Sequence, residues 1–305
     1  MLKHSVTIDP VEYPELKQYF GQKLITADGT TLLGADDKAG IAELITAMEY
    51  LISNPEIPHG KIRICITPDE EITTGVDQFD VSKFGAAFGY TIDGGEIGEI
   101  KYENFNGALA TVNITGKSFH TGYAKNHLVN ASLVGNEFIS LLPPAERPEN
   151  TENYEGFYHL LYFNGDISKA KLEFWVRDFD LNSFEQRKNK VKDIAGKLNL
   201  KYGDSTVNIE IKDQYYNMAE KIKPVMYIVD LAKNAMLEVG VSPKVRPIRG
   251  GSDGSRLTFK GLPCPNIFVG GHNYHGPQEY IPASSMEKAV EVIVKICELG
   301  VNIKT

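Results

Sequence analysis

Acidic residues crowd the end of one short apolar stretch, where they could bind a metal ion or move a proton. The sequence Asp-Glu-Glu at 69–71 follows residues 61–67, in which isoleucine alternates with other residues. The alternation predicts a strand, and Pro68 ends it because proline cannot donate to a sheet ladder. In an open α/β sheet, ligands bind just beyond the carboxyl ends of the strands. Adjacent carboxylates there could divide two jobs, metal binding and proton transfer, and a solvated acidic turn is the competing interpretation.

Further acids stand at two other places where an α/β fold keeps its ligands. Asp36 and Asp37 open an amphipathic helix whose apolar residues, over 41–52, follow the 3.6-residue period. Acids at a helix N-terminus also complement the helix dipole, so this pair has a structural interpretation as well. Asp93 follows an apolar strand predicted over 84–92 and precedes two glycines, which allow a tight turn.

A histidine could complete the site. His275 lies in a glycine-rich loop after a strand predicted at 267–269, and His272 lies only three residues before it. Spacing alone therefore does not decide between the two histidines. Oxygen ligands with one imidazole suit Zn²⁺, Mn²⁺ or Co²⁺, and one carboxylate can bridge two such ions. The candidate site then draws on separate segments that supply Asp36, Glu70 with Glu71, Asp93 and His275.

The composition argues against several other classes of protein. The net charge is -8 and no basic stripe stands out, so nucleic acid is not an expected partner. No run approaches the roughly 20 apolar residues of a membrane span, so no membrane association is expected. Cys65, Cys264 and Cys297 are scattered, and the chain opens without an apolar signal core. Both features predict a cytoplasmic protein without a disulfide framework.

The order of predicted elements divides the chain. A length of 305 residues is sufficient for two domains. Residues 106–213 show the βαββαβ order of a ferredoxin-like domain. The α/β pattern of residues 1–105 returns over 214–305, so we predict one outer domain in two segments, interrupted by an inserted domain at 106–213.

Five motifs in order along the chain carry a resemblance to a known family. They are Gly-Ala-Asp-Asp-Lys-Ala-Gly at 34–40, Thr-Pro-Asp-Glu-Glu at 67–71, Thr-Ile-Asp-Gly-Gly at 91–95, Ile-Arg-Gly-Gly-Ser-Asp-Gly at 248–254 and Asn-Tyr-His-Gly at 273–276. Together they resemble the peptidase T family, bacterial tripeptide aminopeptidases of the di-zinc aminoacylase/carboxypeptidase clan. The resemblance implies an α/β fold, in which a zinc-peptidase catalytic domain has a mixed sheet flanked by helices, with its N-terminal strands missing. The inserted ferredoxin-like α+β domain would be a lid and dimerisation domain, so a homodimer is expected.

The resemblance also implies a role for each acid. Asp36 would bridge two zinc ions, since the family binds two per chain, and the peptide bond that follows Asp36 would be cis. Glu71 and His275 would complete one zinc site, and Asp93 would belong to the other. Glu70 would be the general base, which takes a proton from a water activated by zinc and passes it to the leaving amine.

Substrate contacts are expected from the inserted domain and from the glycine-rich loop. By the resemblance, His120 would reach the substrate carbonyl oxygen, with a polar loop histidine as the alternative. Arg177 and Arg249 could grip peptide carboxylate or carbonyl groups, which suit the planar guanidinium, and a structural ion pair is the alternative for each. For Asn130 we prefer helix N-capping to substrate contact.

The sequence departs from the family in one respect. The clan has a His-x-Asp motif upstream of the Asp-Asp pair, and no histidine here has Asp two residues on. One metal site, formed by Asp36, Glu71 and His275, therefore looks complete, and the other lacks a ligand. The chain could be a truncated or mis-started copy, a mono-zinc hydrolase of reduced activity, or an inactive homologue that still binds metal and dimerises.

We predict from this a zinc metallopeptidase that releases the N-terminal residue from tripeptides. A related dipeptidase or N-acyl amino acid hydrolase is the alternative chemistry, because it shares the metal centre and differs in the substrate end it grips.

Overall fold

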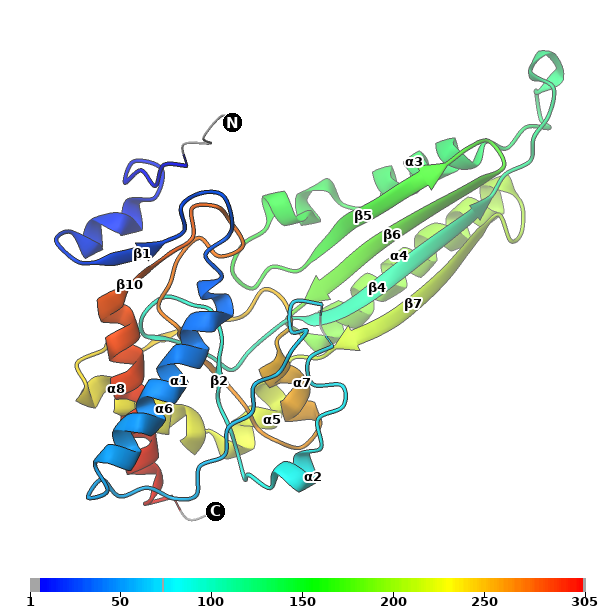
Figure 1. The fold of residues 1–305 in the computed structure, drawn as a ribbon. Helices are drawn as coiled ribbons and strands as arrows, with labels where there is room; N and C mark the ends of the chain where they lie inside the picture. Colours follow the sequence, from blue (N-terminus) through cyan, green and yellow to red (C-terminus); the bar gives the residue numbers. More distant parts are fainter. Residues whose placement is uncertain (1–5, 73, 304–305) are drawn as a thin grey trace. The chain divides into compact units, whose positions relative to one another are not determined.

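The computed structural model of the chain describes residues 6–72 and 74–303 (Figure 1). It divides into two compact units. Unit 1 comprises Met1–Tyr102, Met218–Arg246 and Ser252–Thr305, and unit 2 comprises Glu103–Asn217 and Pro247–Gly251. The boundaries predicted from the sequence, at 105/106 and 213/214, stay predictions, and in the structure Pro247–Gly251 of the glycine-rich loop belongs to unit 2. Each unit is described by itself below.

Unit 1 is an α/β unit with a mixed sheet. Its four-stranded sheet has the order β2-β9-β3-β8, in which β2 with β9 and β3 with β8 are parallel, and β3 with β9 is antiparallel. A separate two-stranded ribbon pairs β1 with β10. The strands are β1 Leu24–Thr26, β2 Thr91–Ile92, β3 Glu99–Lys101, β8 Lys244–Val245, β9 Asn266–Ile267 and β10 Tyr280–Pro282. The predicted mixed sheet is thus confirmed.

Helices flank that sheet. The α-helices of unit 1 are α1 Ala35–Ser53, α2 Val81–Phe84, α5 Ala219–Ile222, α6 Tyr227–Glu238, α7 Asp253–Phe259 and α8 Ala283–Gly300. Short 3-10 helices lie at Pro14–Tyr19 (η1) and Lys223–Val225 (η5). Helix α8 packs against both α1 and α6 (Figure 1). The amphipathic pattern over 41–52 correctly predicted the helix α1 but not its buried face. Ile45 and Ile52 are 46% and 80% exposed, and the face that is buried carries Ala39, Ala47 and Leu51.

The strand predicted over 61–67 is wrong. These residues, all of which the structure describes, form irregular backbone. A strand exists through hydrogen bonds to a neighbouring strand, and none of the described strands pairs with this segment. Ile64 and Ile66 are accordingly 38% and 56% exposed. The strand predicted over 84–92 is also too long, because only Thr91–Ile92 is paired.

Unit 2 has the predicted ferredoxin-like order of elements. An antiparallel sheet of order β5-β6-β4-β7 is packed against α3 and α4. The elements are β4 Asn106–Thr115, η2 Thr121–Tyr123, α3 Ala131–Leu141, η3 Pro144–Glu146, η4 Pro148–Asn150, β5 Phe157–Gly165, β6 Lys169–Asp178, α4 Leu181–Tyr202 and β7 Val207–Tyr215. Phe138, Phe174 and Phe184 lie at the centre of the core between helices and sheet. Figure 1 shows the four long strands of this sheet side by side.

Side-chain caps begin the two long helices of unit 2. Asn130 accepts hydrogen bonds from the amides of Ser132 and Leu133 at the start of α3, which confirms the preferred capping role. Asp180 accepts from the Ser183 amide at the start of α4. Each cap satisfies backbone donors that would otherwise lack an intrahelical partner. Among the described residues, no helix is both long and apolar enough to cross a membrane.

Candidate metal centre and active site

Three of the predicted metal ligands meet in unit 1. One ligand atom from each of Asp36, Glu71 and His275 lies within 4.8 Å of the other two. The Nε2 atom of His275 is 3.1 Å from Asp36 Oδ2 and 3.0 Å from Glu71 Oε1. The Asp36 side chain is 15% exposed, whereas those of Glu71 and His275 are both 61% exposed, so the group is open on one side.

Turns position these side chains. Asp36 lies at the start of α1, two residues after Gly34, whose φ of +67° suits glycine. The peptide bond between Asp36 and Asp37 is cis, as the family resemblance predicted. His275 lies at φ +62° in a loop that is closed at its base by backbone hydrogen bonds between His272 and Tyr280. Asp36 and His275 thus each lie in a turn, and the fold brings these turns together.

The structure separates the two histidines that spacing left undecided. His272 is only 4% exposed, its Nε2 lies 2.7 Å from the Tyr19 hydroxyl oxygen, and its ring stacks on Tyr280. Burial lowers its pKa. His275 instead contacts the carboxylates: burial lowers its pKa, but the charges of Glu71 and Asp36 outweigh this effect and raise the pKa overall. Of the two, His275 is the one placed to bind a cation.

Glu70 lies in a more enclosed and more acidic environment than an ordinary glutamate. Burial, followed by the negative charges of Asp253, Glu71 and Asp36, raises the pKa of Glu70 to about 7. A carboxyl group with a pKa near neutrality can both accept and return a proton at physiological pH.

Asp93 adjoins the three-residue group, although it is not a member of it. Burial raises the pKa of Asp93, and the nearby charges of Asp36 and Glu70 raise it further. Burial and the charges of Asp93 and Asp36 raise the pKa of Asp37 to about 8. Carboxylates that repel one another in this way are stabilised by a divalent cation between them. The donor set of carboxylate oxygens with one imidazole nitrogen therefore fits Zn²⁺ or a similar ion. Within the described residues, His275 is the only histidine in the group, so no counterpart of the His-x-Asp histidine is present there.

The predicted substrate-binding residues lie in unit 2, where two of them are engaged within the fold. Arg177 is 5% exposed and donates hydrogen bonds to the carbonyl oxygens of Ala108 and Val176 and to the side chain of Gln214. Arg249 donates to the segment 151–155 of the same unit. These contacts fit the structural alternative, with backbone and amide acceptors in place of an ion pair.

His120 is the most accessible of the three. Its side chain is exposed, and its Nδ1 accepts a hydrogen bond from the Gly122 amide at 3.2 Å. The other ring nitrogen of His120 makes no hydrogen bond with the described residues. The substrate contacts of His120, Arg177 and Arg249 stay predictions.

Two buried acids near the centre were not predicted as site residues. Asp253 is 5% exposed, accepts a hydrogen bond from the Thr67 hydroxyl at 3.1 Å, and raises the pKa of Glu70. Glu279 is 2% exposed and accepts from backbone amides beside Asp36. The glycine-rich loop was a signal for Asp253, but Glu279 lies more than 240 residues from its partners, and only the fold reveals its contact.

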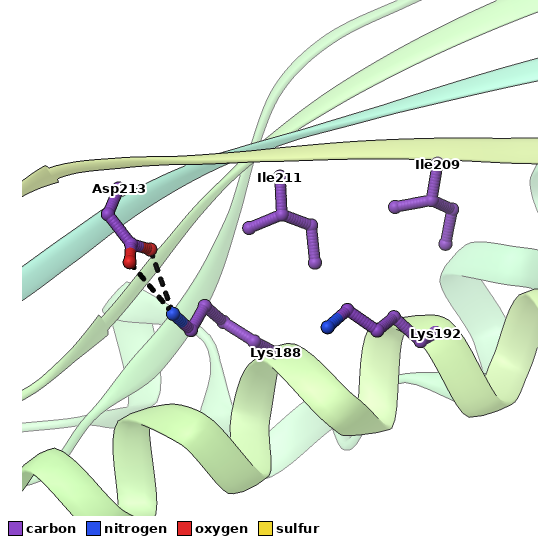
Figure 2. Close-up of a pocket in the computed structure, with 5 residues that line it drawn as sticks. All are labelled: Lys188, Lys192, Ile209, Ile211 and Asp213. Atoms are coloured by element: carbon purple, nitrogen blue, oxygen red, sulfur yellow. Dashed lines mark hydrogen bonds and ion pairs between the residues drawn. The ribbon is translucent and has the colours of Figure 1, made fainter.

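A hollow elsewhere in the molecule is a weaker candidate. It measures about 320 Å³ and lies in unit 2, between α4 and β7, lined by Lys188, Lys192, Ile209, Ile211 and Asp213 (Figure 2). Lys188 Nζ pairs with Asp213 Oδ1 at 2.9 Å, so its charge is already balanced. None of the predicted site residues lines this hollow.

Comparison with known proteins decides the family. The profile described as Peptidase family M20/M25/M40 matches residues 23–299. The chain belongs to this family. A similar relative, Peptidase T of Halothermothrix orenii, is 58% identical over 295 residues, which cover 97% of this chain and 72% of the relative. The M20/M25/M40 fold extends over nearly the whole chain.

Solved structures agree. Aminopeptidase PepT from Bacillus cereus matches with a TM-score of 0.81 at 28% identity, covering 92% of this chain and 74% of that one. A tripeptidase from Staphylococcus aureus matches with a TM-score of 0.80 at 25% identity, covering 90% and 73%. The motifs that sequence analysis assigned to peptidase T thus lie on a fold shared with these enzymes of the M20/M25/M40 family.

Proposed function

We propose that the chain is a metal-dependent aminopeptidase that releases the N-terminal residue from tripeptides. The observation that supports this most directly is the meeting of Asp36, Glu71 and His275 beside Glu70, in a chain 58% identical to a peptidase T. Relatives with solved structures are named as an aminopeptidase and a tripeptidase, which agrees with this substrate class.

The chain's own residues would hold the metal. Asp36, Glu71 and His275 would bind one Zn²⁺, and Asp93 would join Asp36 at a second ion, for which the described residues offer no histidine. When bound, Zn²⁺ lowers the pKa of water and polarises a carbonyl group. We therefore expect one tightly held ion per chain.

Glu70 would move the proton. Its partly buried carboxyl group would accept a proton from the attacking water and return it to the leaving amine. Asp253 supports this role because, together with burial, its nearby negative charge favours uptake of a proton by Glu70.

Hydrolysis of tri-alanine by metal-stripped and Zn²⁺-loaded protein tests the proposal. Turnover should require Zn²⁺ and fall about 10²- to 10⁴-fold in Glu70→Gln, which keeps the size of the side chain but cannot accept the proton. The matched control is Glu49→Gln, an exposed position on α1 that should leave the rate unchanged. N-acetyl-tri-alanine should resist cleavage, since an aminopeptidase requires the free amine. Folded, Zn²⁺-loaded parent without turnover, or a Glu70→Gln variant as fast as the parent, would contradict the proposal.

We further propose a homodimer formed through unit 2, the predicted lid. Strand β5 is an edge strand, and Leu160, Leu161, Tyr162 and Phe163 in it are 36–44% exposed. An unpaired apolar edge is a template for pairing with another strand. The strand Phe157–Gly165 contains no Asp, Glu, Lys or Arg, so antiparallel pairing with the same strand of a second copy brings no like charges together.

Analytical ultracentrifugation tests this interface. Leu161→Glu should shift the protein to monomer, because two such strands would then repel each other. Asn208→Glu on the opposite edge strand β7 is the control and should leave the dimer intact. A parent that is monomeric at all concentrations would refute the proposed dimer.

We also propose a cytoplasmic location. The three cysteines are free thiols, and a reducing compartment keeps thiols in this state.

A further inference from the structure

The turn that leads into α1 is not helical, because Asp36 and Asp37 have non-helical φ/ψ and the peptide bond between them is cis. The amides of this turn therefore need acceptors from outside the helix. The carboxylate of Glu279 supplies them: Oε2 lies 2.7 Å from the Gly34 nitrogen, and Oε1 lies 3.2 Å from the Asp36 nitrogen. Because Glu279 is 2% exposed, water competes little for these bonds.

Glu279 belongs to the same loop as His275. The backbone bonds between His272 and Tyr280, at 2.9 and 3.1 Å, close the loop, and the Glu279 amide donates to Gly276 at 3.1 Å. The loop therefore reaches the start of α1 twice, once through the His275 ring to the Asp36 carboxylate and once through Glu279 to the Asp36 amide. One residue thus links the backbones that carry two predicted metal ligands.

We infer that Glu279 is a positioning residue that holds Asp36 and His275 in register for the metal ion. The inference rests on the proposed function, in which these two residues bind the metal. Two bonds from one carboxylate to one turn restrain both its place and its orientation, which a single bond would not. A carboxylate that accepts from backbone amides makes charge-assisted hydrogen bonds, which are stronger than those between neutral groups. Such outer partners of metal ligands are typically worth about 10- to 100-fold in metal affinity.

Zn²⁺ affinity of the metal-stripped protein tests the inference, measured by competition with a chromophoric chelator. Glu279→Ala should bind Zn²⁺ about 10- to 100-fold more weakly than the parent. The Zn²⁺ affinity of Glu279→Gln should lie between those of the parent and Glu279→Ala, because the glutamine amide keeps one acceptor oxygen. Glu287→Ala, an exposed glutamate on α8, is the control and should match the parent. In turnover of tri-alanine, the kcat of the Glu279 variants should fall at limiting Zn²⁺ and recover at high Zn²⁺.

A second readout keeps the two proposals separate. Hydrogen exchange of a peptide covering residues 33–40 should be faster in metal-free Glu279→Gln than in the metal-free parent. Parent-like Zn²⁺ affinity in a folded Glu279 variant would overturn the inference, even if that variant were less stable. If Glu279→Ala does not fold, Glu279→Gln decides. If the parent itself bound no Zn²⁺, the proposed function would fail, and unchanged exchange would then overturn the positioning role as well.

Discussion

Replacing Arg249 with alanine distinguishes a structural arginine from a substrate-binding one. The guanidinium of Arg249 donates to the carbonyl oxygens of Asn153 at 2.7 Å, Glu155 at 3.1 Å and Thr151 at 3.4 Å, and to the Thr151 hydroxyl at 2.9 Å. All four acceptors belong to one connecting segment of unit 2. The substitution would leave that segment without its common donor.

The aromatic contacts of Arg249 add to the expected effect. The guanidinium lies over the rings of Phe105 and Phe157, with 5.1 and 5.7 Å to their centroids. A charged hydrogen bond contributes about 1.5–3 kcal/mol when buried, and a cation–π contact about 0.5–1 kcal/mol at an exposed site. Because Arg249 is only half-buried and water can replace some of the bonds, we expect a loss of about 2–4 kcal/mol in the free energy of unfolding of unit 2.

Urea unfolding followed by tryptophan fluorescence measures this loss, since Trp175, the single tryptophan, lies in unit 2. With a slope of about 2 kcal/mol per M, the midpoint should fall by about 1–2 M. Arg249→Lys should recover only part of the lost stability. Its ammonium group keeps the charge but cannot make the forked contacts of the guanidinium. The control Arg147→Ala, an exposed arginine of the same unit, should change little. The KM of folded Arg249→Ala for tri-alanine should stay near that of the parent. A large rise in KM at unchanged stability would refute this reasoning and identify Arg249 as a substrate contact.

Three further predictions concern unit 2. Asn130→Ala should destabilise it by about 1 kcal/mol, whereas Asn130→Ser, which restores a cap, should not; equal losses in urea unfolding would contradict the capping role. Phe138→Ala should cost about 3–5 kcal/mol, because the ring is fully buried and leaves a cavity, and Phe138→Leu should cost less; an unchanged midpoint would show that the site collapses freely. Hydrogen bonds from Lys201 and Tyr202 lower the pKa of Glu137, so its contribution is present above about pH 4.5 and is lost as pH falls through the folded-state pKa. The free energy of unfolding should therefore fall more steeply below about pH 4.5 in the parent than in Glu137→Gln, and identical pH profiles would exclude the linkage.

The spacing of apolar residues along the chain predicted the long helices and strands, because such spacing repeats along a regular element. The 3.6-residue spacing over 41–52 predicted helix α1, which forms there, but the buried face is the one that carries Ala47 and Leu51, whereas Ile52 is exposed. The βαββαβ order of unit 2 could be recognised for the same reason, since its strands and helices are long. Residues 61–67 show the limit of this reasoning: alternation describes which face a strand would bury, but pairing requires a neighbour that the pattern does not identify.

The sequence by itself determined the types of residue at the site. Acids and glycines at turns, in a recognisable order, were sufficient to nominate Asp36, Glu70, Glu71, Asp93 and His275 and the family they resemble. This is possible because a ligand must have a particular donor atom, and a tight turn often requires glycine, whatever the rest of the chain does.

Only the tertiary structure decided which of these residues meet. Spacing could not choose between His272 and His275, and the choice became clear once one ring was buried against Tyr19 and the other lay between two carboxylates. The raised pKa of Glu70 and the contact of Glu279 with the start of α1 are likewise absent from any local pattern. Both depend on groups far apart in the chain, and electrostatic and hydrogen-bond energies depend on distance in space rather than on separation in sequence.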